Sequence, residues 1–303
     1  MHMNLQFRWE IGRGRLLLLT TTSLRKMNIK NILVPIDFST CSKNALKSAI
    51  KLAKSFDAKI HMVNAVHVHH PHPDFVGGSL IDSIMMDYES QVKESFEELE
   101  SEIIELKEVP HEADRFISYL TDAIYSESEQ KNIDLIVMGT RAEHDSIEHL
   151  IGTRATDIIE TSKVPVIVIP ENVHDFNPKK IGFASDLSEI KNTKRLDLIG
   201  MIAAMFDAKI YVFSIVDDPD KLSAQDQKLL KDIAARFKEH ECSARTVQAD
   251  SITRGIVDFS KSHDLDMLAM IPREYSFFQK LFRKSVTKNI AIDIDIPLLS
   301  FHE

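Results

Sequence analysis

An internal repeat divides this chain of 303 residues into two similar halves. The peptide FDAKI occurs at residues 56–60 and again at 206–210, an offset of 150. DLIVM at 134–138 resembles DMLAM at 266–270, an offset of 132, and the segments that follow align without a gap. Because similarity over such a length covers a whole domain, we expect one folding unit to occur twice in the chain.

Each unit alternates short apolar runs with amphipathic segments, which is the pattern of strands joined by helices. Apolar residues recur every three or four positions from 45 to 56, and lysines fall on the other side of the helical wheel, so one helix face is expected to be buried. The five strands expected in the first copy lie at residues 31–36, 59–66, 108–117, 135–139 and 164–169.

The nearly continuous apolar character of these strands predicts parallel sheets covered by helices on both faces. The fold class is therefore α/β, with two tandem, doubly wound, five-stranded parallel-sheet domains. We expect the first domain at 27–170, a linker at 171–178 and the second domain at 179–303. Residues 1–26 contain only a short apolar run, LLLL, and are interpreted as a disordered leader or an upstream start.

Composition narrows the classes of partner. The formal net charge is -9, which gives no overall attraction to nucleic acid or to anionic lipid, so neither is expected as a partner. No other segment is a candidate membrane span. The two cysteines, Cys41 and Cys242, lie in different halves and outside any CxxC spacing, which is typical of a reducing compartment and favours a cytoplasmic location.

The ligand site of a doubly wound sheet lies beyond the carboxyl ends of its strands. The first strand ends in Pro35, Ile36 and Asp37, and the fourth strand ends in Met138 and Gly139. Gly139 opens the loop GTRAEHDSIEHLIGTRATDII at 139–159, which ends at the start of a helix. Glycines admit the backbone of a loop close to phosphate oxygens, and the free N–H groups of a helix start bind anions.

The spacing of Gly139, Gly152 and Thr153, together with VPID at 34–37, resembles the universal stress protein family, and the resemblance covers both copies. It implies an adenine nucleotide alpha hydrolase-like fold and a stress-response function. ATP-binding members of that family carry G-x2-G-x9-G-(S/T) and an aspartate after the first strand that contacts adenosine. By resemblance, Asp37 contacts adenosine, Gly139, Gly152 and Thr153 hold phosphates, and Val63 lines the adenine side.

Ala142 departs from the family pattern, because it stands where the pattern has its middle glycine. If the position needs a positive φ, alanine costs on the order of 1 kcal/mol, which weakens nucleotide binding by roughly tenfold without abolishing it. Arg141 and Arg154 flank the loop, and they either pair with phosphates or are solvated surface charges. The implied cofactor is ATP, with or without Mg²⁺.

The second copy has lost the loop pattern. Ile271, Glu274, Lys284 and Ser285 replace Gly139, Ala142, Gly152 and Thr153 in the gap-free alignment. Branched and charged side chains now stand where open backbone is required, so the second copy is expected to be a degenerate partner domain. In the resembling family the last strands pair between subunits. A tandem chain can form this pairing within itself as a pseudo-dimer, and it can also form a homodimer.

The first copy has 18 more residues than the second between its second and fourth strands, and a histidine tract lies at the beginning of this longer segment. His67, His69, His70 and His72 lie within HVHHPHPD at 67–74, and imidazoles at this density suit Zn²⁺, Ni²⁺ or Cu²⁺. The alternative interpretation is a polar loop stiffened by prolines near the ligand crevice.

Other enzyme motifs are absent. The chain has no GxxxxGK[ST], no GxGxxG after a strand and no nucleophile elbow, so efficient ATP hydrolysis is not expected to be its function. Three classes of function remain open: an ATP-binding sensor or regulatory protein, a nucleotide-independent interaction module, and a carrier of Zn²⁺ or of a small apolar ligand.

Overall fold

The computed structural model describes residues 28–67, 78–140, 153–187, 190, 193–271 and 295–301, and within these ranges the side chains of residues 78–85, 153 and 194 are left out of the description. Strands and helices alternate in both halves, as the sequence predicted. The first half contains β1 Asn31–Pro35, α1 Thr40–Phe56, β2 Lys59–Ala65, α2 Gly78–Glu102, η2 Ile104–Glu108, β3 His111–Phe116, α3 Leu120–Gln130, β4 Leu135–Thr140, α4 Thr153–Thr161 and β5 Val166–Pro170. The second half contains β6 Lys180–Ala184, η3 Thr193–Arg195, α5 Leu196–Phe206, β7 Lys209–Val216, η4 Pro219–Lys221, α6 Ala224–Arg236, β8 Cys242–Gln248, α7 Ile252–Ser262, β9 Met267–Met270 and β10 Leu298–Ser300.

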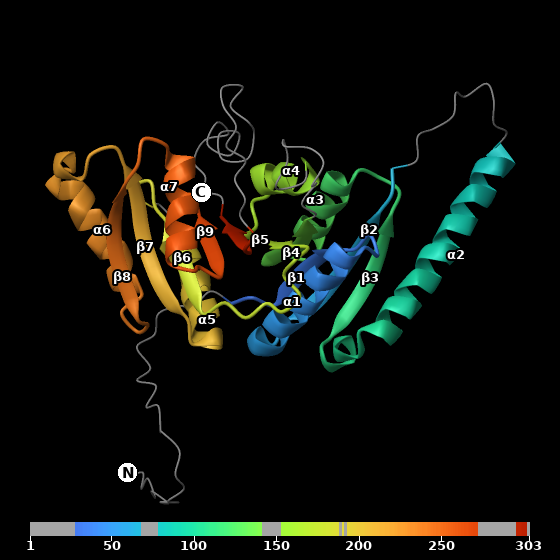
Figure 1. The fold of residues 1–303 in the computed structure, drawn as a ribbon. Coiled ribbons are helices and arrows are strands. Elements are labelled where there is room, and N and C mark those ends of the chain that lie inside the picture. Colours follow the sequence, from blue (N-terminus) through green and yellow to red (C-terminus); the bar gives the residue numbers. More distant parts are fainter. Residues whose placement is uncertain are drawn as a thin grey trace, which may run out of the picture.

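The strands form one continuous ten-stranded sheet in the order β3-β2-β1-β4-β5-β10-β9-β6-β7-β8 (Figure 1). Pairing within each half is parallel, whereas β5 and β10 pair antiparallel at the centre, with Ile167 opposite Leu299. The two halves therefore meet through the last strand of each. This is the intrachain pairing that the apolar terminal strands predicted.

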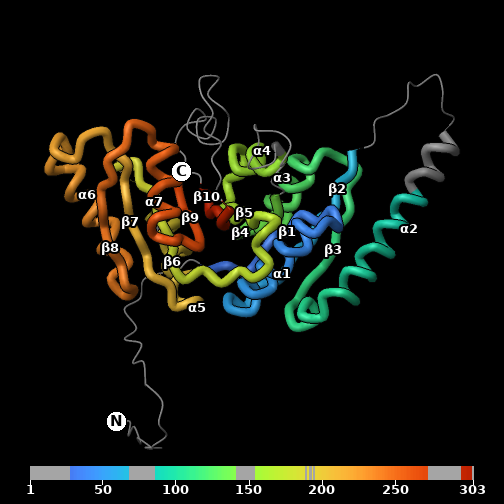
Figure 2. Tube along the Cα trace, in the orientation of Figure 1, coloured from blue at the N-terminus to red at the C-terminus, as the bar shows by residue number. Residues whose placement is uncertain are grey.

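Helices cover both faces of the sheet and enclose two apolar cores (Figure 2). One core contains side chains of α1, α2, α5 and α6 and continues through both halves by way of Ile167, Leu299 and Phe301. The other contains side chains of α3, α4 and α7. The predicted buried face of the first helix is confirmed, because Ala45, Leu46 and most of its other apolar residues are buried.

The third strand is shorter than the sequence predicted. The expected strand at 108–117 begins only at His111, because residues 104–108 form the 3-10 helix η2. The carbonyl oxygen of Pro110 still accepts a hydrogen bond from Ile60 N at 2.9 Å, so the chain joins the sheet immediately before the strand. Proline has no N–H to donate to a ladder, which sets the boundary at this position.

The segment expected to be a linker is packed against α1. Asn44 Nδ2 donates to the carbonyl oxygen of Glu171 at 2.9 Å, and Lys51 forms an ion pair with Asp175. Phe176 is buried and meets Phe206 of α5 edge to face, with ring centroids 5.4 Å apart. Residues 171–178 therefore tie the first helix of one half to the first helix of the other.

The backbone repeats more closely than the side chains do. Among the described residues, six other than glycine have a positive φ, and they form three pairs at the offsets of the repeat: Phe38 with Leu187, Asp57 with Asp207, and Asn132 with Asp264. Aspartate and asparagine tolerate left-handed backbone, whereas it is costly for Phe38 and Leu187, so its retention at that turn indicates that both halves need the same turn. The two domains share one backbone plan.

Among the residues that the structure describes, no helix is both long enough and apolar enough to span a bilayer. The longest, α2, has 25 residues and carries many charged side chains.

Candidate functional site

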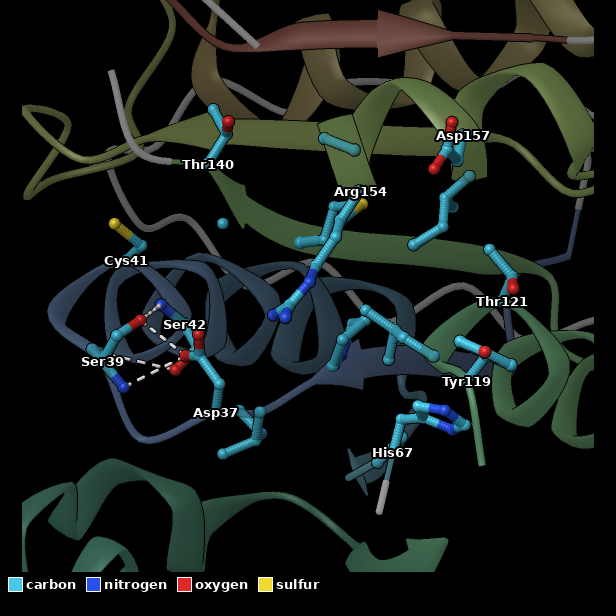
Figure 3. A pocket seen from close by; sticks show the side chains of 18 of the residues that line it. Asp37, Ser39, Cys41, Ser42, His67, Tyr119, Thr121, Thr140, Arg154 and Asp157 are labelled. Carbon is cyan, nitrogen blue, oxygen red and sulfur yellow. Dashed lines mark hydrogen bonds between the residues drawn. The ribbon is translucent and has the colours of Figure 1, made fainter. Parts of the chain in front are cut away.

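A cavity of about 580 Å³ opens at the carboxyl ends of β1, β2 and β4 in the first half. Figure 3 shows the side chains that surround it, which come from the β1–α1 turn, the end of β2, the start of α3 and the first turns of α4. This is the crevice that the topology predicts. Its lining residues are Pro35, Ile36, Asp37, Ser39, Cys41, Ser42, Ala65, His67, Ser118, Tyr119, Leu120, Thr121, Met138, Gly139, Thr140, Arg154, Ala155, Asp157 and Ile158.

Asp37 organises the turn between β1 and α1. Its Oδ1 accepts hydrogen bonds from Ser39 N at 3.1 Å and from Ser39 Oγ at 2.5 Å, and Ser39 Oγ in turn accepts from Ser42 N as the N-cap of α1. Loss of water around the carboxyl raises the pKa of Asp37, but hydrogen bonds from Ser39 and Ser42 outweigh this and lower the pKa below its usual value. Asp37 is therefore an ionised, exposed acceptor at the cavity (Figure 3).

Packing alone requires a glycine at position 139, whether or not a ligand binds. A Cβ at this position would lie 2.4 Å from the carbonyl oxygen of Cys41, in the first turn of α1. Atoms of this kind cannot approach so closely, so the glycine is needed for α1 to pack against the end of β4. The sequence interpretation of Gly139 as a phosphate position is thus not required to explain the residue.

Arg154 supplies the positive charge of the cavity. It is the second residue of α4, its side chain is exposed, and in Figure 3 the guanidinium points into the cavity on the side toward Asp37. Thr153 begins α4, so the free N–H groups of this helix start lie at the same side of the cavity. A guanidinium beside a helix start favours an anionic ligand group.

The remaining predicted contact residues divide into two groups. Pro35, Ile36 and Met138 line the cavity, although their side chains are almost fully buried. Val63 is fully buried in the core and is not part of the cavity lining; its carbonyl oxygen accepts a hydrogen bond from Ile36 N at 2.8 Å. On the β2 side, the lining is formed by Ala65 and His67 instead.

Several predicted residues lie outside the described part of the chain. They are Arg141, Ala142, Gly152, His69, His70 and His72, together with Glu274, Lys284 and Ser285 of the second half. Within the described ranges, no group of three histidine, cysteine, aspartate or glutamate side chains is placed to hold a metal ion.

Sequence reasoning missed the wall of the cavity formed by residues 118–121. These residues follow β3, whose apolar pattern is weak, and they include the first two residues of α3, Leu120 and Thr121. The rule that ligands bind beyond the carboxyl ends of parallel strands applies to this connection as well. The end of the third strand could therefore have pointed to residues 118–121 as part of the site, since the sequence predicted this strand end to within one residue.

The second half keeps the turn but not the residues around it. Leu187 has the same left-handed φ as Phe38, and its N–H donates to Ser185 Oγ at 3.3 Å. Ile271 stands where Gly139 stands in the first half, and it packs against the apolar core. α5 begins only at Leu196, the counterpart of Leu46, whereas α1 begins at Thr40. The first turn of α1 therefore packs directly on the end of β4 in the half that has the glycine, Gly139.

Comparisons with known proteins point to one protein family for both halves of the chain. The Universal stress protein family model matches residues 28–170 and again residues 177–302. Universal stress protein A homolog 1 of Coxiella burnetii is 29% identical over 144 residues, which are 47% of this chain and 97% of that protein.

A solved structure shows the same fold over most of the chain. A universal stress protein from Archaeoglobus fulgidus superimposes with a TM-score of 0.68 at 16% identity, over 90% of this chain and 98% of that one. A universal stress protein family protein from Arabidopsis thaliana, solved with AMP bound, matches 47% of this chain and 92% of its own length at 19% identity and a TM-score of 0.34.

The fold is a tandem pair of α/β domains with a cavity at the strand ends of the first of them. Because the family model matches both halves and together covers most of the sequence, the chain belongs to the universal stress protein family, in a tandem two-domain form.

Proposed function

We propose that the first domain binds an adenine nucleotide, ATP, as a sensor or regulatory ligand, and that the second domain serves as its pairing partner. The observation that carries this proposal is the cavity in which Asp37 and Arg154 lie on facing elements at the strand ends. A volume of about 580 Å³ lies within the range of small-molecule sites.

The charges of the cavity suit the two ends of a nucleotide. Arg154 and the start of α4 favour phosphate groups, because both present donors and positive charge. Asp37, an ionised acceptor on the β1 side, suits the hydroxyl and amino donors of a nucleoside. The family resemblance implies the same roles for Asp37 and for the start of α4.

We further propose that the domain binds the nucleotide without turning it over at a useful rate. The pKa of Asp37 is lowered by its hydrogen bonds, which makes this carboxylate a weak base at neutral pH. Phosphoryl transfer needs a positioned water and metal-bound phosphates. Steady-state phosphate release measured with purified protein should therefore stay close to that of the Arg154→Ala variant.

The direct test is calorimetric titration of ATP into nucleotide-stripped protein. Wild type is expected to bind, and Asp37→Asn and Arg154→Ala are each expected to weaken binding by about tenfold, since each removes a charged group worth roughly 1.5 kcal/mol. The second domain provides the matched control, because Asp186 occupies the position of Asp37 there. Asp186→Asn should leave the affinity unchanged. No heat of binding in the wild-type protein would contradict the proposal.

One observation favours a nucleotide-independent interaction module as the alternative. The packing of α1 against β4 explains Gly139 without any ligand. Heat denaturation of freshly purified protein, followed by anion-exchange chromatography of the supernatant, distinguishes the two functions. Adenine nucleotide released from wild type but not from Arg154→Ala supports the binding function, whereas its absence from both supports the alternative.

A further inference from the structure

Tyr119 occupies a helix position that is poorly suited to it. It is the N-cap residue of α3, where serine, threonine, aspartate or asparagine normally satisfies a free N–H group, and its side chain makes no capping hydrogen bond. At the equivalent position of the second half, Ser251 caps α7 by accepting a hydrogen bond from Arg254 N. Helix stability therefore does not account for the tyrosine.

Tyr119 is also exposed, at 57% of its surface, although it is one of the larger apolar side chains of the domain. Its ring stacks on the imidazole of His67, with ring centroids 3.9 Å apart and an angle of 17° between the planes. Both residues line the cavity. The second half has Asp217 and Ser251 at the counterpart positions, and neither can form a stack.

The stacked pair lies across the cavity from Asp37. Figure 3 shows Tyr119 and His67 together on one wall, Asp37 on another, and Arg154 between them. His67 follows the end of β2 and Tyr119 precedes α3, whereas Arg154 belongs to α4 beyond β4. The lining therefore changes from paired aromatic rings at one end of the cavity to a guanidinium and a carboxylate toward the other end. A nucleotide likewise has a flat base at one end and a polar, anionic remainder.

We propose that the His67–Tyr119 pair is the wall on which the base of the nucleotide stacks, and that it gives the cavity its preference for a nucleotide over a bare polyphosphate. The inference rests on the proposed function and specifies the part of the ligand that Tyr119 recognises. Aromatic rings bind the flat faces of bases, and base stacking typically contributes a factor of about ten or more in affinity. The loss of a helix cap at Tyr119 is then explained by ligand contact.

The test compares ATP with inorganic tripolyphosphate as ligands of the full-length protein. Tyr119→Ser removes the ring and restores the capping residue found at Ser251. ATP affinity is expected to fall about tenfold in this variant, while tripolyphosphate affinity stays within about twofold of wild type. Tyr119→Phe keeps the ring and should keep the affinity for ATP. Tyr125→Ala is the matched control, because Tyr125 is a similarly exposed tyrosine of α3, at 61%, that does not line the cavity.

Thermal unfolding separates this role from a structural one. The melting temperature of ligand-free Tyr119→Ser is expected to equal or exceed that of wild type, because the new serine caps α3. Equal ATP affinity in Tyr119→Ser and Tyr125→Ala, with ATP still bound by wild type, would overturn the stacking inference and leave the proposed function in place. Failure of wild type to bind ATP would overturn both.

Discussion

The two domains fill the same space between β2, β3 and α3, or their counterparts, in opposite ways. In the first domain this space holds charges: His61 Nδ1 lies 2.8 Å from Glu112 Oε1, and Lys131 Nζ lies 2.5 Å from the same oxygen. Lys59 also pairs with Glu112. The polar cluster thus joins two strands and the end of a helix.

In the second domain the equivalent space holds rings. Phe259 stacks on Phe213 with ring centroids 4.1 Å apart and on His263 at 3.9 Å, and Tyr211 meets it edge to face. By the offsets of the repeat, Tyr211 replaces His61, and Phe259 and His263 replace Glu127 and Lys131. The same backbone arrangement thus holds a charged set in one domain and an aromatic set in the other.

The largest effect is expected when a residue of the charged set is placed among the aromatic residues of the second domain. Phe259→Glu places the residue of the first domain inside the aromatic stack, where Phe259 is only 4% exposed. A buried carboxylate without its partners should destabilise the protein by more than about 4 kcal/mol, measured by urea denaturation. Phe259→Leu is the control for lost volume, and it should be clearly less harmful. An equal loss in both variants would mean that packing, and not charge, separates the two sets.

The next largest effect is expected at Gly139, which lies at the end of β4 where the second domain has Ile271 after β9. Gly139→Ile introduces the residue found at Ile271 and forces a Cβ to within 2.4 Å of the Cys41 carbonyl oxygen. A cost of at least about 3 kcal/mol in unfolding free energy is expected. Gly200→Ala in α5 is the control, because its added Cβ meets no atom closer than 3.6 Å, and it should stabilise the helix by up to about 1 kcal/mol. Tolerance of isoleucine at 139 would show that α1 can move off the strand.

The charged cluster around Glu112 should make the stability of the protein depend on pH in the acidic range. Hydrogen bonds from Lys131 and Lys59 lower the pKa of Glu112 from 4.5 to about 2. Because the folded-state pKa is the lower one, the stabilisation is fully present above about pH 4.5 and is lost as the pH falls toward about 2. Glu112→Gln should cost about 2 kcal/mol at pH 7, and its stability should depend less on pH across this window.

Glu127 is the control for that measurement. Burial raises the pKa of Glu127, so its ionisation opposes folding as the pH rises through its usual range. Glu127→Gln should therefore change stability in the opposite direction to Glu112→Gln near neutral pH. Identical urea midpoints for the two variants across the pH range would show that the cluster does not act through charge.

The smallest expected effect tests the helix caps. Ser251→Ala removes the acceptor that caps α7 and should cost about 1 kcal/mol. At the counterpart Tyr119, alanine removes no cap, so Tyr119→Ala should leave the free energy of unfolding of the ligand-free protein closer to wild type. Chemical denaturation of both variants in one buffer measures the difference, and equal losses would contradict the distinction between the two positions.

The repeat and the period of the apolar residues were enough to predict the fold class, the order of the elements and the crevice. The ends of the first and fourth strands, near Asp37 and Gly139, were predicted to within one residue because local sequence patterns define them. The aromatic wall was not predicted, since His67 and Tyr119 are 52 positions apart and meet only when β2 and α3 are placed side by side. The packing reason for Gly139 likewise depends on Cys41, which the sequence places on another element.

The antiparallel pairing of β5 with β10 has a consequence for how the molecule can vary. When two identical subunits associate, every substitution enters both partners, and dilution can separate them. Here β5 and β10 belong to one polypeptide, so dilution cannot separate them. A substitution in one of the two strands also leaves the other strand unchanged. Covalent fusion thus gives each half its own sequence to change, while the surface that joins them is kept.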